Sequence, residues 1–399
     1  EPEPGHRARF AQSRLSDEVR PMTKLSRRSM LAMLGTVGFT PRFFAAHAAA
    51  LEDRKLVFVV LRGALDGLAT LIPDDDALNG LRSHTIPHQR ERLDLGNGFR
   101  VHPSLTAIRD LYTLGEVGFV HAAATHYRDR SHFDGQDFLE TLGRSSDRDG
   151  WLNRVVQTIG GTALAVGYDL PLAMRGDGPA TNWSPPVFAS VSDDLLDRLQ
   201  DLYQGQPLLS DPLTMARATV AQDISMNNIA RGPEAQYAVS SKALGQLMSA
   251  DGGPNIGMMS FDGWDTHANQ ATPLATRLRG LDNALSELKL ALGTAWRETA
   301  VVMCSEFGRT AGENGSRGTD HGTGGLVILA GGAIKGGRIH GDWPGLRTRD
   351  LYENRDLAPA NDVTAVLKGV LSDHLSISRS NLDGRIFSSS SATMRGLVI

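Results

Sequence analysis

Cysteine is almost absent from this chain of 399 residues, since Cys304 is the single one. Its isolation excludes an intrachain disulfide and a zinc site made of thiolates. A strong excess of one charge sign is also missing: 41 Lys and Arg stand against 45 Asp and Glu, without a long basic run. We therefore expect no nucleic-acid partner. With 41% hydrophobic and 22% charged residues, the composition is that of a globular protein and excludes a disordered or fibrous chain.

A long hydrophobic run is lacking at the N-terminus, where the apolar stretch 30–39 is shorter than the ~20 residues of a membrane span. It follows the pair Arg27-Arg28 and precedes small residues, 46–50, of the kind that a signal peptidase cuts. Residues 24–50 are thus predicted to be a twin-arginine signal peptide, with the twin-arginine translocation machinery as a partner and a periplasmic or secreted location. The alternative is an amphipathic surface helix with a chance arginine pair. Residues 1–23 form a polar N-terminal extension, and no stable membrane span is expected in the mature chain.

The remainder, 51–399, has the pattern of one large α/β domain. Short apolar, β-branched runs typical of buried parallel strands alternate with segments of helical periodicity. The predicted strands are 55–61, 117–121, 255–261, 300–304 and 326–330, and the predicted helices are 104–114, 133–142, 151–159, 240–248, 273–296 and 362–371. This alternation predicts a doubly wound, mostly parallel sheet. The irregular, proline-containing stretch 171–231 is predicted to be an inserted cap.

Acidic, imidazole and hydroxyl side chains gather in the loops beside all five predicted strands. Ligands of such sheets bind beyond the carboxyl ends of the strands, so we expect these loops to form one site. The loop residues are Asp66; Ser131 and His132; Asp262, Asp265 and His267; Glu306 and Arg309; and Asp320 and His321. Carboxylates and imidazoles without thiolates are ligands of zinc, manganese or iron. Two such ions about 4 Å apart can clamp the oxygens of an in-line displacement.

Ser131 stands just before the predicted helix 133–142. A hydroxyl at a helix N-terminus lies in a partly positive field, which suits a nucleophile that attacks an anionic phosphate or sulfate. The alternative, equally favoured by the spacing, is that Ser131 only caps the helix, with Asp134 three residues later. Arg130 and His132 flank Ser131 and could bind a substrate oxyanion, or be solvated loop residues.

Several motifs, in this order, resemble the bacterial "domain of unknown function 1501" family. They are RGALDG, RSHFDGQDFLET, GWLNR, GWDTH, SEFGRT, TDHG, GGAIKGGRIHG and NDVTAVLKGVLSDHL. The resemblance runs from about Leu56 to the C-terminus. It implies a twin-arginine signal and a distant branch of the alkaline phosphatase and sulfatase superfamily, hence an alkaline phosphatase-like or sulfatase-like α/β fold.

The same resemblance implies a metal site. Its ligands would be Asp66, Asp265, His267, Glu306, Asp320 and His321, with Ser131 as the nucleophile. The superfamily spacing between the paired Asp and His is four residues, against two here, so Asp262 is an alternative to Asp265. Members usually end the next strand with Asp-His, whereas this chain has Glu306-Phe307, and Phe307 cannot bind a metal. We expect a divalent metal, with zinc favoured and manganese, calcium or iron as alternatives. The site would hold one or two ions. His340 is a further candidate ligand.

Arg309 directly follows this motif and could bind a substrate oxyanion, because its planar fork matches phosphate or sulfate. A structural salt bridge is the alternative. Together these features predict an exported metal-dependent hydrolase of phosphate or sulfate esters, whose substrate is a small-molecule or polysaccharide ester. The alternative is a non-catalytic envelope protein that keeps the fold and binds a partner.

Replacement of the two signal arginines by lysine, Arg27→Lys with Arg28→Lys, should leave unprocessed protein in the cytoplasm. The twin-arginine pair is the feature on which this export route depends. Cell fractionation followed by immunoblotting measures the outcome. Normal export of the double variant would show that the signal assignment is wrong.

Overall fold

The protein is described here by a computed structural model. It describes residues 53–143, 148–184, 233–388 and 391–399, with the short pieces 198–200, 202–207, 209–210 and 213–214 between them. The N-terminal extension 1–23 and the predicted signal peptide 24–50 lie outside the described residues, as does most of the predicted cap 171–231.

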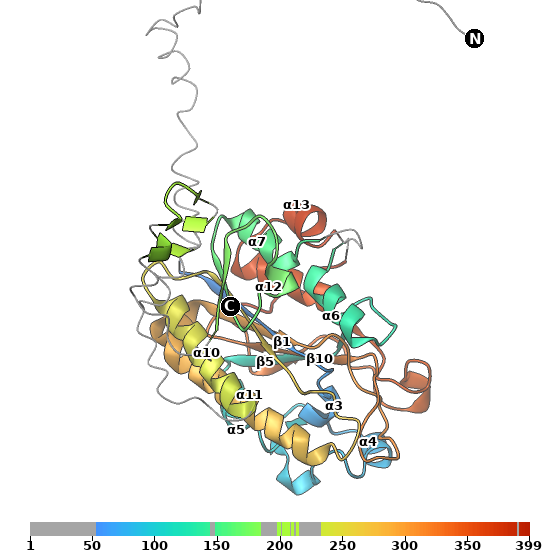
Figure 1. The fold of residues 1–399 in the computed structure, drawn as a ribbon. Coiled ribbons are helices and arrows are strands. Elements are labelled where there is room, and N and C mark those ends of the chain that lie inside the picture. Colours follow the sequence, from blue (N-terminus) through green and yellow to red (C-terminus); the bar gives the residue numbers. More distant parts are fainter. Residues whose placement is uncertain are drawn as a thin grey trace, which may run out of the picture. The chain divides into compact units, whose positions relative to one another are not determined.

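A nine-stranded, mostly parallel sheet forms the centre of the domain (Figure 1). The strand order is β11-β5-β10-β9-β1-β8-β6-β7, and β12 also pairs with β5. Only β10 runs against its two neighbours among these pairings. The strands are β1 Lys55–Leu61, β5 Val117–Ala124, β6 Ala163–Val166, β7 Ala180–Trp183, β8 Ile256–Phe261, β9 Thr299–Cys304, β10 Gly325–Ala330, β11 Arg338–His340 and β12 Asn361–Asp362.

Helices cover both faces of this sheet, which confirms the predicted doubly wound class (Figure 1). One face packs against α5 Thr106–Thr113, α10 Pro233–Ser249 and α11 Ala271–Leu292, and the other against α6 His132–Thr141, α7 Trp151–Ile159 and α12 Val363–His374. The side chains of β1 alternate between the two cores: Val57 and Val59 enter the first, Leu56 and Phe58 the second. Because this strand is buried on both faces, its residues form the continuous apolar run seen in the sequence.

Smaller elements complete the domain. They are α3 Gly67–Thr70, α4 Asp76–Leu81 and α13 Arg379–Asn381; a sheet of β2 Leu71–Pro73, β4 Phe99–Val101 and β3 Leu93–Asp94; 3-10 turns at Gln89–Glu91, Leu172–Met174, Gly293–Glu298 and Thr348–Asp350; and a π-helical turn at Leu382–Ile386. Among the described residues, no helix is both long and apolar enough to cross a membrane.

Two predicted helices differ most in extent from the observed ones. The helix predicted at 240–248 begins earlier, at Pro233, and the one predicted at 273–296 ends at Leu292. Gly293, with a φ of +53°, ends α11, and the chain continues as a 3-10 turn. The described beginning of the predicted cap contains β7, which extends the main sheet beside β6.

The topology brings five loops to one edge of the sheet. Strands β1, β5, β8 and β9 run in the same direction, so their carboxyl ends lie together. Because β10 runs the opposite way, the loop that precedes it reaches the same edge. The five loops whose acidic, imidazole and hydroxyl residues were expected to form one site therefore all lie at this edge.

Cys304 is the last residue of β9 and is fully buried. Burial, with a smaller contribution from the nearby Glu306 carboxylate, raises the pKa of its thiol to about 12. The thiol is therefore protonated and enclosed in the core, and it is not a candidate nucleophile.

Gly308 should be intolerant of a side chain. A Cβ at this position would lie 2.0 Å from the carbonyl oxygen of Gly324, whereas at Gly312, in the same loop, it would meet nothing closer than 3.9 Å. We expect Gly308→Ala to lower the free energy of unfolding by about 1–3 kcal/mol or more, because backbone must move. Gly312→Ala is the matched control, and chemical denaturation measures both. Equal stability of the two variants would contradict the close packing of these loops.

Candidate metal centre

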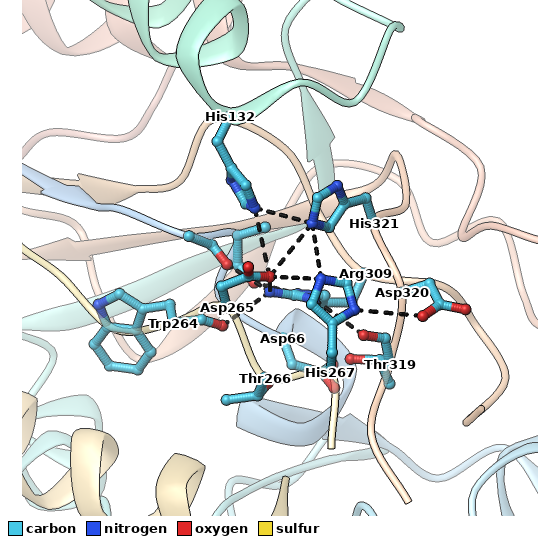
Figure 2. Close-up of polar contacts among 12 residues, drawn as sticks. Asp66, His132, Trp264, Asp265, Thr266, His267, Arg309, Thr319, Asp320 and His321 are labelled. Atoms are coloured by element: carbon cyan, nitrogen blue, oxygen red, sulfur yellow. Dashed lines mark hydrogen bonds and ion pairs between the residues drawn. The ribbon is translucent and has the colours of Figure 1, made fainter. Parts of the chain in front are cut away.

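Four side chains bring their ligand atoms together at this edge of the sheet (Figure 2). His132 begins α6, Asp265 and His267 follow β8, and His321 precedes β10. The Nε2 atom of His321 lies 2.9 Å from Nε2 of His132 and 3.0 Å from Nε2 of His267. Asp265 Oδ1 lies 3.4, 2.9 and 3.3 Å from the Nε2 atoms of His132, His267 and His321. We call these four residues the His–Asp cluster.

The spacing of the His–Asp cluster fits a metal ion. The ligand atoms of His132, Asp265 and His321 all lie within 4.8 Å of one another, and His267 adjoins two of them. Two ligands bound to one zinc ion at about 2.0–2.1 Å in tetrahedral directions lie about 3.3 Å apart. The separations among His132, Asp265 and His321 are close to that value, so small side-chain shifts suffice for these three residues to hold an ion.

The other ring nitrogen, Nδ1, of each imidazole faces an acceptor. The pairs are His132 with Glu306 Oε1 at 2.7 Å, His321 with the carbonyl oxygen of Arg130 at 2.9 Å, and His267 with Asp320 Oδ1 at 3.4 Å. Carboxylate and carbonyl oxygens only accept hydrogen bonds, so each Nδ1 carries the hydrogen. In the neutral rings, the Nε2 lone pairs then point into the cluster, which is how metal-binding histidines are oriented.

Without a cation, this arrangement is repulsive. Lone pairs of three nitrogens and a carboxylate oxygen face one another at 2.9–3.4 Å. The donor that the structure directs at Asp265 Oδ1 is the Arg309 guanidinium, on one side of the cluster. A cation is therefore needed among these atoms, either a metal ion or a proton that turns one ring into an imidazolium.

Charges around the His–Asp cluster favour a divalent ion over a proton. The carboxylates of Asp265, Glu306 and Asp320 are offset by Arg309 alone among these groups, which leaves two negative charges. Burial would raise the pKa of Asp265, but the hydrogen bond and charge of Arg309 hold it below its usual value. A proton has one preferred place, because the hydrogen bond to Glu306 raises the pKa of His132 while burial lowers that of His321. One proton neutralises half of the excess, whereas a divalent metal ion neutralises it fully.

Glu306 supports the cluster from outside it. Its Oε1 atom faces His132 Nδ1 and also accepts from Gly63 N at 2.8 Å and from Gln136 Nε2 at 3.0 Å. Burial would raise the pKa of Glu306, but these donors, His132 first, bring it below its usual value. Its Oε2 atom is buried without a hydrogen-bond partner among the described residues. The carboxylate thus orients His132 through its Oε1 atom.

His132 was not among the metal ligands expected from the sequence, which lacks the usual histidine where Phe307 stands. The His132 ring instead stacks on Phe307, with the ring centroids 5.0 Å apart and the planes at 28°. An imidazole thus reaches the cluster from the loop after β5. Its place directly after Ser131, at the same sheet edge, was the available signal.

The remaining expected ligands lie around the cluster. Asp320 contacts His267 Nδ1 and accepts from Asn314 Nδ2 at 3.0 Å, so it takes an outer position like that of Glu306. Asp66 is buried, and its carboxylate accepts from Arg82 and from Gln270 Nε2. The alternatives lie elsewhere: the side chain of His340 faces the Lys335 carbonyl at 3.1 Å, and Asp262 is exposed.

Ser131 is the N-cap residue of α6, but its side chain makes no capping hydrogen bond. It stands between Arg130, whose carbonyl faces His321 Nδ1, and His132. Arg130 has a φ of +57°, the left-handed region that non-glycine residues rarely adopt, and its guanidinium is bound to Asp356. Ser131 is therefore held between two residues that touch the His–Asp cluster, and its hydroxyl is not used for capping.

Arg309 is buried and bonded to protein groups on all sides. Its donors go to the carbonyl oxygens of Ala64, Gly63, Trp264 and Thr319 and to the carboxylate of Asp265. The side chain is 1% exposed. This geometry makes it a connector of loops and leaves little capacity for a substrate oxyanion.

Solved structures to which the chain is similar are distant in sequence and in geometry. A sulfatase from Pseudoalteromonas sp. shares 12% identity, with 75% of this chain and 67% of that chain covered and a TM-score of 0.36. The phosphonate monoester hydrolase of Agrobacterium radiobacter shares 9%, with 86% and 79% covered and a TM-score of 0.43. The lipoteichoic acid synthase LtaP from Listeria monocytogenes shares 9%, with 88% and 80% covered and a TM-score of 0.40.

The sequence itself gives a family match. No curated protein matches this chain. Residues 195–386 match the sequence profile of the family described as "Protein of unknown function (DUF1501)". This range contains Asp265, His267 and His321, whereas His132 and Ser131 precede it. The family resemblance expected from the motifs is thereby confirmed over residues 195–386.

Proposed function

We propose that this protein is an exported, metal-dependent hydrolase of phosphate or sulfate esters. The observation that carries the proposal is the convergence of three imidazole Nε2 atoms on the Asp265 carboxylate, with each Nδ1 held from outside. Such a set of lone pairs is suited to binding a cation.

Nitrogen ligands with one carboxylate favour zinc or a similar transition metal over magnesium or calcium. Such an ion supplies Lewis acidity at an ester that carries negative charge. The partly exposed side chains of Asp265 and His267, at 42% and 44%, place the cluster within reach of solvent and substrate. A small-molecule or polysaccharide ester can therefore approach from this side.

Ser131 is the proposed nucleophile. Its Oγ attacks phosphorus or sulfur, the ester bond to the alcohol breaks, and the serine proton ends on the departing alcohol oxygen. Water then cleaves the seryl phosphate or sulfate. The free hydroxyl, the N-terminus of the ten-residue helix α6 and the adjacent His132 support this role. The predicted twin-arginine signal supports a periplasmic or secreted location.

A non-catalytic binding protein is the second candidate, favoured by Arg309. The guanidinium that could have held a substrate anion is enclosed among backbone carbonyls and Asp265. On this alternative, the cation stabilises loops that bind an envelope partner, and the protein carries metal without turnover.

The His–Asp cluster should lose its metal in His321→Ala. His321 contacts both neighbouring imidazoles and Asp265, so its removal should lower metal content and hydrolysis of aryl phosphate or aryl sulfate by about 100-fold. Elemental analysis and a spectrophotometric assay measure the two quantities, and prolonged chelation of the wild type should give the same loss. His340→Ala is the matched control, because its side chain faces the Lys335 carbonyl. Unchanged metal and turnover in His321→Ala would refute the metal centre.

Ser131→Ala should abolish hydrolysis without unfolding the protein. Because its side chain makes no capping bond, we expect the free energy of unfolding to change by less than about 0.5 kcal/mol. Ser131→Thr keeps a hydroxyl and should retain measurable turnover. Steady-state kinetics and denaturation are measured on the same preparations. A stable Ser131→Ala variant with wild-type turnover would end the nucleophile assignment but leave a hydrolase that uses water.

A further inference from the structure

We infer that the centre holds a single metal ion, because the Arg82 guanidinium already supplies the positive charge that Asp66 would otherwise take from a second ion. The inference rests on the proposed function, since it concerns the number of ions at the same site. If the centre held two ions, Asp66 would be one of the ligands expected from the sequence.

Both oxygens of Asp66 are engaged by protein donors. Oδ1 accepts from Ala69 N at 3.1 Å, as the N-cap of α3, and Oδ2 accepts from Arg82 and from Gln270 Nε2 at 2.6 Å. The carboxylate is 1% exposed. A metal ion would have to displace a guanidinium from Oδ2, in a place that solvent does not reach.

Arg82 is held in place independently of Asp66. Its Nε donates to the carbonyl oxygen of Ala311 at 2.8 Å, and its Nη2 donates to that of Thr310 at 2.6 Å. The side chain is completely buried. A guanidinium stays protonated under all ordinary conditions, so this positive charge is permanent, unlike a bound ion that can dissociate.

Gln270 links Asp66 to the loops that carry the His–Asp cluster. Its amide nitrogen faces Asp66, and its amide oxygen accepts from the hydroxyls of Thr266 and Thr319 at 2.8 and 2.7 Å. Thr266 lies between Asp265 and His267, and Thr319 is two residues before His321. Gln270 is fully buried. The loops that carry the cluster are thus tied to Asp66 through an amide.

The other two carboxylates act on imidazoles of the His–Asp cluster. Glu306 Oε1 faces His132 Nδ1 and accepts from Gly63 N and Gln136 Nε2, and Asp320 Oδ1 faces His267 Nδ1 and accepts from Asn314 Nδ2. Asp265, His132, His267 and His321 then remain as a set around one ion. The residues present fit one cation and do not fit a second at Asp66.

The test is the number of ions in the intact protein. The full chain is loaded with Zn²⁺, freed of excess metal and analysed for zinc per chain. In a second experiment the chain is loaded with Mn²⁺, and its electron paramagnetic resonance spectrum distinguishes an isolated ion from a coupled pair. We expect one ion per chain and the spectrum of isolated Mn²⁺. Two ions per chain, or a coupled spectrum, would overturn the inference.

A charge-neutral double variant, Asp66→Asn with Arg82→Met, tests the role of the pair. It should keep one zinc ion per chain, whereas His321→Ala should lose it. Loss of zinc from a folded double variant would overturn the inference, and the wild-type measurement decides the matter if the variant does not fold.

The outcomes distinguish this inference from the proposed function. One ion without ester hydrolysis refutes the proposed function alone, and two ions with hydrolysis refute this inference alone. A protein that binds no metal refutes both.

Discussion

The buried guanidinium of Arg309 joins four of the five loops around the candidate metal centre. It follows β9, and its donors reach carbonyls in the loops after β1 and β8 and before β10. Its bond to Asp265 fixes the one carboxylate that every imidazole of the cluster contacts. Removal of this one side chain would leave four backbone carbonyls without their partner, so the positions of the ligands depend on it.

Sequence patterns were sufficient for the fold because its central strands are strongly apolar. The run 55–61 is buried on both faces and coincides with β1, and four further strands were found within a few residues. Short strands such as Ala163–Val166 and Arg338–His340 were missed, since four or three residues with little β-branching carry no recognisable period. Their pairing depends on neighbouring strands that only the tertiary structure supplies.

The site was predictable in outline and less so in detail. Position beyond the strand ends was enough to indicate His267 and His321, but it left the choice between Asp262 and Asp265 open. The sequence could not distinguish a carboxylate that faces the cluster from one that supports an imidazole, as Glu306 does, or pairs with arginine, as Asp66 does. Those roles depend on partners such as Arg82 and Gln270, which are distant along the chain.

The single thiol of the protein has a further consequence. Cys304 ends β9, in the middle of the sheet and two residues before Glu306, and its side chain is enclosed and protonated. A thiol reagent can therefore react only when β9 separates from its neighbours. The rate of that reaction reports how often the centre of the sheet opens. Comparing the rate with and without bound metal would show whether metal binding at the sheet edge changes how often the strands separate.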